Sequence, residues 1–328
     1  MNRQAIGTCG LCTALIMVFL CSLMIGEVFV PPTQVITAIS GGEAPLGFFV
    51  TELRLPRAWA AVVVGAGLGA AGAITQSMLR NPLASPDIIG VTAGAGLAAV
   101  ALLATGSGLP VLLAAWSLPL AAALGGTLAG LAVVWLSWSG GIVVRRVVLV
   151  GLGINAGLGA VTSWLLVQAD LPGLNSALTW LAGSLNAVQG PALTAVTILT
   201  GIGLFAAVMA GRPLALLRFD EHTARALGLR VPAARVALFV IAVLMASVTT
   251  ALVGTVAFVA FVAPQLALAL LRTEGPPPLG GALAGGIIML AADLMATRAF
   301  PTALPVGLIT SFVGVPFLLW ILLRRSRV

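Results

Sequence analysis

The sequence predicts an all-α membrane protein that crosses the bilayer about ten times, with residues 1–328 forming a single domain. Of the 328 residues, 60% are hydrophobic and only 8% are charged, and the mean hydropathy is +1.16. A soluble domain carries roughly 25% charged residues, so this chain could not cover a surface that faces water. The strand-like alternation that a membrane β-barrel needs is absent, whereas the 39 glycines suit closely packed membrane helices.

Apolar runs of about 20 residues, long enough to cross roughly 30 Å of hydrocarbon, place the spans. The first run is long for a cleavable signal and is interpreted as a retained span. The uncharged stretch between Arg235 and Arg272 would reach about 54 Å as one helix, so we expect two short spans that fold back near Gly254. The predicted spans are 6–30, 58–79, two within 88–144 broken at 106–110, 147–168, 191–210, two within 236–271, 279–297 and 304–323.

Arginine positions predict the orientation of these spans. All 16 basic residues are arginine, and the cytoplasmic ends of membrane spans are normally rich in basic residues. With ten spans and a cytoplasmic amino terminus, every arginine except Arg54, Arg57 and Arg298 falls on the cytoplasmic side. Both termini are therefore predicted to be cytoplasmic, and so is the most polar loop of the chain.

That loop, residues 214–235, reads LALLRFDEHTARALGLRVPAAR and is predicted to present a short helix to the cytoplasm. Asp220 is suited to cap the amino end of a helix, and Glu221 complements its positive pole. Gly228 would end the helix, and Pro232 would prevent its extension. Either this helix docks a cytosolic subunit, or it is an ordinary interfacial helix with anchoring arginines. Its apolar side would comprise Leu216, Leu217, Ala224 and Leu227.

Residue types that are missing exclude several kinds of chemistry. The chain has no lysine, and a nucleotide-binding P-loop needs one to reach the phosphates. If ATP drives this protein, another subunit must hydrolyse it. Cys9 and Cys12 have the spacing of half a zinc or redox site, but nothing completes it, so no metal site is predicted. No basic patch is interleaved with aromatic residues, which disfavours nucleic-acid binding.

Polar residues near the predicted outer side allow two interpretations each. Arg54 and Arg57 lie three residues apart at the mouth of the second span, where both guanidinium groups could face outward. They either bind a partner or anchor the helix at the lipid headgroups. Asp293 is the only acid well inside a predicted span. It either relays protons or accepts hydrogen bonds from a neighbouring helix or from Arg298.

Four further motifs are spread along the chain: LRLPR at 53–57, NPLASP at 81–86, GTVAFVAFVAP at 254–264, and Ala292-Asp293 followed by LPVG at 304–307. Together with the polar loop, they make the chain resemble the permease subunits of ABC importers for iron–siderophores, haem and vitamin B12. The ferric-citrate and hydroxamate permeases are the most similar in character. The resemblance implies the type II ABC importer permease fold, in which residues 1–328 form one transmembrane permease domain in the bacterial inner membrane.

The resemblance also implies partners and sites. A second permease copy or a paralogue would pair with this chain, and a dimer of ATPase subunits would dock on Asp220, Glu221, Thr223, Ala224, Arg225, Leu227 and Gly228. A substrate-binding protein would dock outside on Arg54, Arg57 and Arg298. The translocation path would include Asn155, Thr162 and Ser163, while Asp293, Pro82 and Pro86 would have structural roles.

The chain departs from the family pattern at two contacts. Relatives often have Pro-His-x-x-Arg where this chain has Pro264-Gln265-Leu266-Ala267-Leu268, and a TEGPPP loop at 273–278 replaces a basic one. On the outer side, Thr297-Arg298 stands where Ala-Arg is expected, and Ala303 replaces an acid. These changes bear on the inner contact near Gln265 and on the outer contact at Arg298, not on the fold.

The sequence therefore predicts a permease subunit that moves an iron(III)–siderophore or related metal chelate inward by alternating access. ATP and magnesium would bind only the partner ATPase, and no cofactor or catalytic residue is expected in this chain. The alternative is an ion-coupled secondary transporter of a small solute, which would need several intramembrane acids. An intramembrane serine protease is excluded because the only histidine, His222, lies in the cytoplasmic loop.

Overall fold

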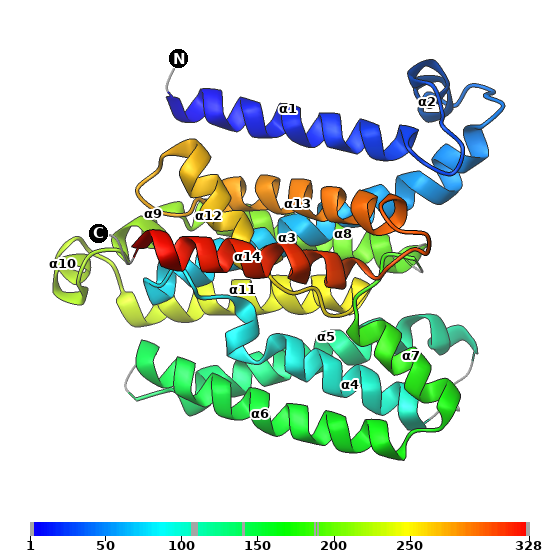
Figure 1. The fold of residues 1–328 in the computed structure, drawn as a ribbon. Helices are drawn as coiled ribbons and strands as arrows, with labels where there is room; N and C mark the ends of the chain where they lie inside the picture. Colours follow the sequence, from blue (N-terminus) through cyan, green and yellow to red (C-terminus); the bar gives the residue numbers. More distant parts are fainter. Residues whose placement is uncertain (1–2, 106–110, 140–141, 187, 189, 326–328) are drawn as a thin grey trace.

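Long helices lie side by side through the molecule, with short helices gathered at the two ends of the bundle (Figure 1). The structure is a computed structural model that describes residues 3–105, 111–139, 142–186, 188 and 190–325. The break predicted at 106–110 lies outside these residues. Within the described part, seven helices are long and apolar enough to cross a membrane, and three shorter helices are also apolar.

The seven long spans include the helix that runs from 49 to 79, in which a π-helical turn, η1 (Phe49–Arg54), leads into α3. They are α1 (Arg3–Met24), α3 (Leu55–Leu79), α5 (Val111–Leu136), α6 (Val144–Gln168), α8 (Pro191–Met209), α11 (Val231–Val253) and α13 (Pro278–Arg298). The three shorter apolar helices are α4 (Val91–Thr105), α12 (Val259–Leu271) and α14 (Val306–Arg325).

The two ends of the bundle carry different short elements. One end holds α9 (Gly211–Leu216) and α10 (Glu221–Ala226), and the first turn of α1 and the last turn of α14 lie at this same end (Figure 1). The opposite end holds α2 (Pro32–Ile39) and α7 (Leu171–Leu181). A 3-10 turn, η2 (Pro86–Ile89), precedes α4.

Several predicted boundaries needed correction. The predicted spans leave residues 31–57 as a connection between the first two spans, but this connection contains α2 and η1, and α3 begins at Leu55. Gly254 does break the uncharged stretch, because it adopts a φ of +82° that favours glycine. However, only α12, with 13 residues, is a short span, whereas α11 has 23 residues.

The central helix α3 is buried along most of its length, and glycines let its neighbours approach its backbone closely. A Cβ added at Gly69 would lie 2.0 Å from the carbonyl oxygen of Gly281 in α13. One added at Gly65 would lie 2.2 Å from the carbonyl oxygen of Gly285, again in α13. Small residues of this kind allow tight helix packing where lipid removes the hydrophobic drive for association.

We expect Gly69→Ala to lower the free energy of unfolding by about 1–3 kcal/mol, because the α3 and α13 backbones must separate. Gly201→Ala in α8 is the matched control, since a Cβ there meets nothing within 4 Å. This control should leave stability unchanged or raise it by up to about 1 kcal/mol through helix propensity. Thermal unfolding of the purified protein in detergent measures both, and equal melting of the two variants would contradict the packing argument.

Candidate functional site

The polar residues singled out in the sequence lie at opposite ends of the helix bundle. The segment 214–235, which we call the coupling segment, lies at the end that carries α10 (Figure 1). Arg54 and Arg57 belong to the start of the long span that begins in η1, at the other end. The two groups are therefore separated by the length of the helix bundle.

The coupling segment forms the short capped helix that the sequence predicts. Asp220 Oδ1 accepts a hydrogen bond from the backbone N–H of Thr223 at 3.0 Å, and its Oδ2 accepts one from Thr223 Oγ1 at 2.5 Å. These bonds, the side-chain one first, lower the pKa of the Asp220 carboxyl group. At the other end, Gly228 has a φ of +85° and Leu229 N donates to Ala224 O at 3.0 Å. The last helical residue is Ala226, one before the predicted Leu227.

Two arginines outside α10 hold it to the helix bundle. Arg80, just after α3, donates from Nε to Leu217 O at 2.9 Å and also binds Phe219 O, directly before the Asp220 cap. Arg235, in the second turn of α11, donates to Glu221 Oε2 and to Ile142 O, both at 3.3 Å. The short helix is thus tied to α3 on one side and to α11 and the α5–α6 loop on the other.

Burial divides the coupling segment into an inner and an outer face. Leu217 and Ala224 are buried, as predicted for its apolar side, and Leu216 is half-buried. Leu227 was assigned to the same side, but it is 49% exposed because the helix ends before it. Thr223 and Arg225 are also exposed, and Arg225 pairs with Glu221 at 2.5 Å. The outer face therefore offers an apolar side chain among polar groups.

The sequence allows Arg54 to face outward, but in the structure its guanidinium group is bonded within the chain. It donates to the carbonyl oxygens of Leu23 at 2.8 Å, Met24 at 3.0 Å and Val28 at 2.5 Å. These acceptors belong to the end of α1 and the residues after it, which have no further helical turn to satisfy them. Arg54 thus closes the carboxyl end of α1.

Arg57 is also engaged within the chain. Its Nε lies 2.9 Å from Asp293 Oδ2 and its terminal nitrogen 2.7 Å from Asp293 Oδ1, a two-point ion pair between α3 and α13. A third contact, at 2.6 Å, reaches Asn186 Oδ1 in the loop after α7. Asp293 therefore accepts hydrogen bonds from a neighbouring helix, which is one of the two donors predicted for it, and the donor is Arg57 of α3 rather than Arg298. Arg298 is exposed and pairs with no acid in the described part of the chain.

The predicted path residues lie on α6, a helix at the edge of the bundle with few buried residues (Figure 1). Asn155 Nδ2 donates to the carbonyl oxygen of Asp87 at 2.9 Å, so this side chain holds the 81–90 loop against α6. Thr162 Oγ1 and Ser163 Oγ donate to carbonyl oxygens one turn earlier on α6, at 2.8 and 3.0 Å. A Cβ added at Gly153 or Gly157 meets nothing within 4 Å. One face of α6 is therefore uncovered in the single chain.

The NPLASP loop makes a compact turn between α3 and α4. Asn81 Oδ1 accepts from Leu83 N at 2.9 Å, Pro82 follows in the turn, and buried Pro86 begins η2. Asp87, which the sequence analysis passed over, accepts hydrogen bonds from Thr92 Oγ1 and from Ser85 Oγ, the latter at 3.3 Å. This carboxylate thereby fixes the loop to the first turn of α4. Asp87 directly follows the NPLASP motif, and this position is the feature of the sequence that could have indicated its role in the loop.

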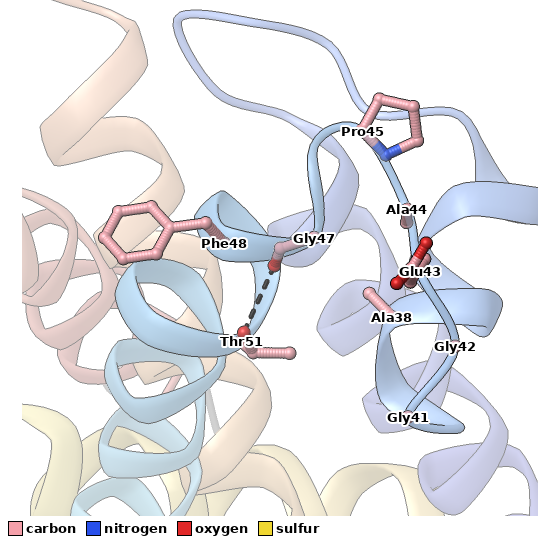
Figure 2. A pocket seen from close by; sticks show the side chains of 9 residues that line it. All are labelled: Ala38, Gly41, Gly42, Glu43, Ala44, Pro45, Gly47, Phe48 and Thr51. Atoms are coloured by element: carbon pink, nitrogen blue, oxygen red, sulfur yellow. Dashed lines mark hydrogen bonds between the residues drawn. The ribbon is translucent and has the colours of Figure 1, made fainter.

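A hollow of about 630 Å³ lies at the α2 end, between α2 and η1 (Figure 2). Its lining is mainly small residues, and the only charged one is Glu43. Thr51 Oγ1 donates a hydrogen bond to Gly47 O at 3.2 Å. Such a lining lacks the paired groups that acid–base or nucleophilic catalysis needs. Among the described residues, no three His, Cys, Asp or Glu side chains are grouped so that they could hold a metal ion.

Comparison with known protein families finds a match over almost the whole chain. The model of the FecCD transport family matches residues 14–324. The ferric enterobactin transport system permease protein FepG of Escherichia coli is 36% identical over 331 residues, covering 99% of this chain and 98% of that protein. The achromobactin transport system permease protein CbrC of Dickeya dadantii is 38% identical, covering 99% of this chain and 93% of that protein.

Solved structures agree with this arrangement of helices. A metal-chelate type ABC transporter in an inward-facing conformation has a TM-score of 0.82 and 26% identity, and the match covers 97% of this chain and 99% of that one. PsaBC from Streptococcus pneumoniae has a TM-score of 0.56 at 19% identity, which supports the fold alone. The helical architecture is therefore that of a membrane permease.

The Arg57–Asp293 pair can be tested with a double-mutant cycle. Arg57 is 26% exposed and Asp293 only 10% exposed as side chains, so breaking the pair leaves a partly buried charge unpartnered. We expect Arg57→Gln and Asp293→Asn each to lower the free energy of unfolding by about 1.5–3 kcal/mol. The double variant should lose less than the sum of the two. Additive losses in thermal unfolding would show that the two side chains do not stabilise each other.

Proposed function

This chain belongs to the FecCD transport family, and from that membership we propose that it is the transmembrane permease subunit of an ATP-driven importer. Its cargo would be an iron(III)–siderophore or a related metal chelate. The observation that carries this proposal is the end-to-end match to permeases named for ferric enterobactin and achromobactin transport. Other relatives are named for hydroxamate, citrate and hemin, so the cargo class is an iron chelate rather than one compound.

In this proposal, ATP is hydrolysed on a partner subunit that docks on the coupling segment. The chain has no lysine with which to build a P-loop. Exposed Leu227, Thr223 and Arg225 would contact the ATPase, while Asp220, Glu221, Ala224 and Gly228 shape and seat the helix. ATP and magnesium would bind that partner alone.

The anchors of α10 suggest how the work of the ATPase would reach the membrane. Arg80 ties the residues before α10 to the end of α3, and Arg235 ties Glu221 to α11 and to Ile142. Closure of two ATPase subunits would move α10, and through these two arginines it would move α3 and α11 at the same time. Because α3 packs on α13 through backbone contacts at Gly65 and Gly69, the helices would move as rigid bodies and switch between inward and outward openings.

The outer end would receive a substrate-binding protein. Exposed Arg298 is the best available basic contact, because Arg54 and Arg57 are engaged with α1 and Asp293. Arg57 keeps 26% of its side chain exposed and could still meet an acidic partner at its edge. Of the three arginines predicted to dock the binding protein, Arg298 would therefore be the principal contact.

A second permease subunit would cover the open face of α6. A Cβ added at Gly153 or Gly157 would meet nothing within 4 Å, and small residues one turn apart favour close helix association. Asn155, Thr162 and Ser163 would then lie near the path between the two copies. Both termini and α10 would face the cytoplasm of a bacterium, with ten helices crossing its inner membrane.

Docking of the ATPase can be tested at Leu227. Leu227→Asp places a charge at the proposed contact and should reduce recovery of the cognate ATPase subunit with the tagged chain at least about tenfold. ATP-driven uptake of a ferric siderophore into vesicles holding the whole importer should fall with it. Leu171→Asp makes the same change at an exposed leucine of α7, at the opposite end of the bundle, and should preserve recovery of the ATPase subunit. Uptake without ATP by vesicles holding this chain alone would refute the importer assignment.

The subunit contact can be tested at Gly157. A leucine there would keep two α6 helices apart, and we expect Gly157→Leu to raise the dissociation constant of the permease pair at least about tenfold. Gly201→Leu on α8, which also meets open space in the single chain, should leave pairing unchanged. Subunit stoichiometry from native mass spectrometry in detergent measures both variants. A stable pair in Gly157→Leu would move the interface away from α6.

A further inference from the structure

A cavity of about 260 Å³ opens at the α10 end of the molecule, behind the coupling segment. Its walls come from the last turn of α3, from α12, and from the TEGPPP loop that follows α12. Arg218, two residues before the Asp220 cap, completes the wall. The cavity thus lies where the coupling segment meets the transmembrane helices.

Two buried polar groups at this cavity have no hydrogen-bond partner among the described residues. Ser77 is only 5% exposed, and its Oγ has no hydrogen-bond partner among the described residues. The Nε of Arg218 is likewise buried and unpartnered within the described part of the chain. Buried polar groups in folded proteins are normally satisfied, so two such donors at one cavity point to a missing acceptor. Arg80 adds a second guanidinium group, held in place by its bonds to Leu217 O and Phe219 O.

The other groups in the cavity wall do not supply that acceptor. Gln265 Nε2 donates to Gln76 Oε1 at 2.6 Å, Gln76 Nε2 donates to Phe261 O at 3.0 Å, and Asn81 Oδ1 accepts from Leu83 N at 2.9 Å. None of these amides is hydrogen-bonded to Ser77 Oγ or to Arg218 Nε. Glu274 is the only acid in the wall; it is exposed, and the three ion pairs of the described residues do not include it. The cavity wall therefore has two positively charged side chains, Arg80 and Arg218, and one negatively charged side chain, Glu274.

We propose that this cavity is a binding site for a phosphate-type oxyanion, held by Arg218, Arg80 and the Ser77 hydroxyl group. Guanidinium groups match the geometry of oxyanions and bind them with short, charge-assisted hydrogen bonds. A bound oxyanion would join Arg218, in the coupling segment, to Ser77, in α3. The site goes beyond the transport function because it needs neither chelate nor ATP.

Gly275 supports this geometry. A Cβ at residue 275 would lie 2.4 Å from Cζ and 2.5 Å from Nε of Arg218, so the guanidinium group rests directly on the loop backbone. Thr273 Oγ1 donates to Gly275 O at 2.8 Å and holds the loop in this shape. Replacing Gly275 with alanine would displace the Arg218 guanidinium group without changing any charge.

The same chemistry is available from free phosphate and from the phosphodiester of an anionic lipid, and the experiment distinguishes them. The full chain, purified with its ATPase subunit, is placed in nanodiscs of phosphatidylcholine and titrated with inorganic phosphate. A parallel sample uses discs that contain phosphatidylglycerol. A ligand that binds only the folded state raises the unfolding temperature in a saturable way.

We expect saturable stabilisation by inorganic phosphate in phosphatidylcholine discs, with the dissociation constant raised at least about tenfold in Arg218→Gln. Ser77→Ala and Gly275→Ala should weaken binding in the same direction. Arg212→Gln removes a charge from the neighbouring α9 at an exposed position outside the cavity and should bind phosphate normally. If a lipid headgroup is the natural occupant, phosphatidylglycerol should stabilise wild type but not Arg218→Gln and should block the phosphate effect.

Two results would overturn the site. One is the absence of saturable stabilisation of the wild-type protein by both inorganic phosphate and phosphatidylglycerol. The other is equal stabilisation of wild type, Arg218→Gln and Gly275→Ala, which would place any anion elsewhere. Recovery of the ATPase subunit is measured on the same samples. Loss of phosphate binding with unchanged ATPase recovery would separate this site from the docking proposal.

Discussion

Close backbone contact between α3 and its neighbours is the constraint on which the rest of the structure depends. Apolar side chains gain little by leaving lipid for another apolar surface, so membrane helices associate mainly through packing. Gly65 and Gly69 bring the α3 backbone against α13, and Gly72 brings it against Ala260 of α12. This tight core fixes the ends of α3, and those ends carry Arg57 on one side and Arg80 on the other.

Arginine serves as the cap of interrupted helices in this lysine-free chain. Arg54 satisfies carbonyl oxygens after α1, Arg80 those between α9 and α10, and Arg235 that of Ile142 before α6. Carbonyl groups at helix ends have no intrahelical partner, and a planar guanidinium group can reach several of them at once. These arginines therefore join elements that are far apart in the sequence.

These contacts connect the two ends of the molecule. Arg57 joins α3 to α13 and to Asn186 beside α7, while Arg80 joins α3 to the lead-in of α10. A force applied at α10 would thus reach the outer loops along α3. The cavity at Ser77 and Arg218 lies on this route, so an anion bound there would stiffen the joint between the coupling segment and α3.

The sequence by itself determined the membrane class, the approximate positions of the long apolar helices, the capped helix at Asp220 and the break at Gly254. Composition, span length and capping chemistry are local properties, so they can be read without knowing which helices touch. Only the tertiary structure decided the partners: Arg57 with Asp293, Arg54 with the end of α1, and Arg80 with the coupling segment. Residues far apart in the chain make these contacts, and no local pattern determines whether an arginine at a helix end faces a partner protein or a carbonyl oxygen of its own chain.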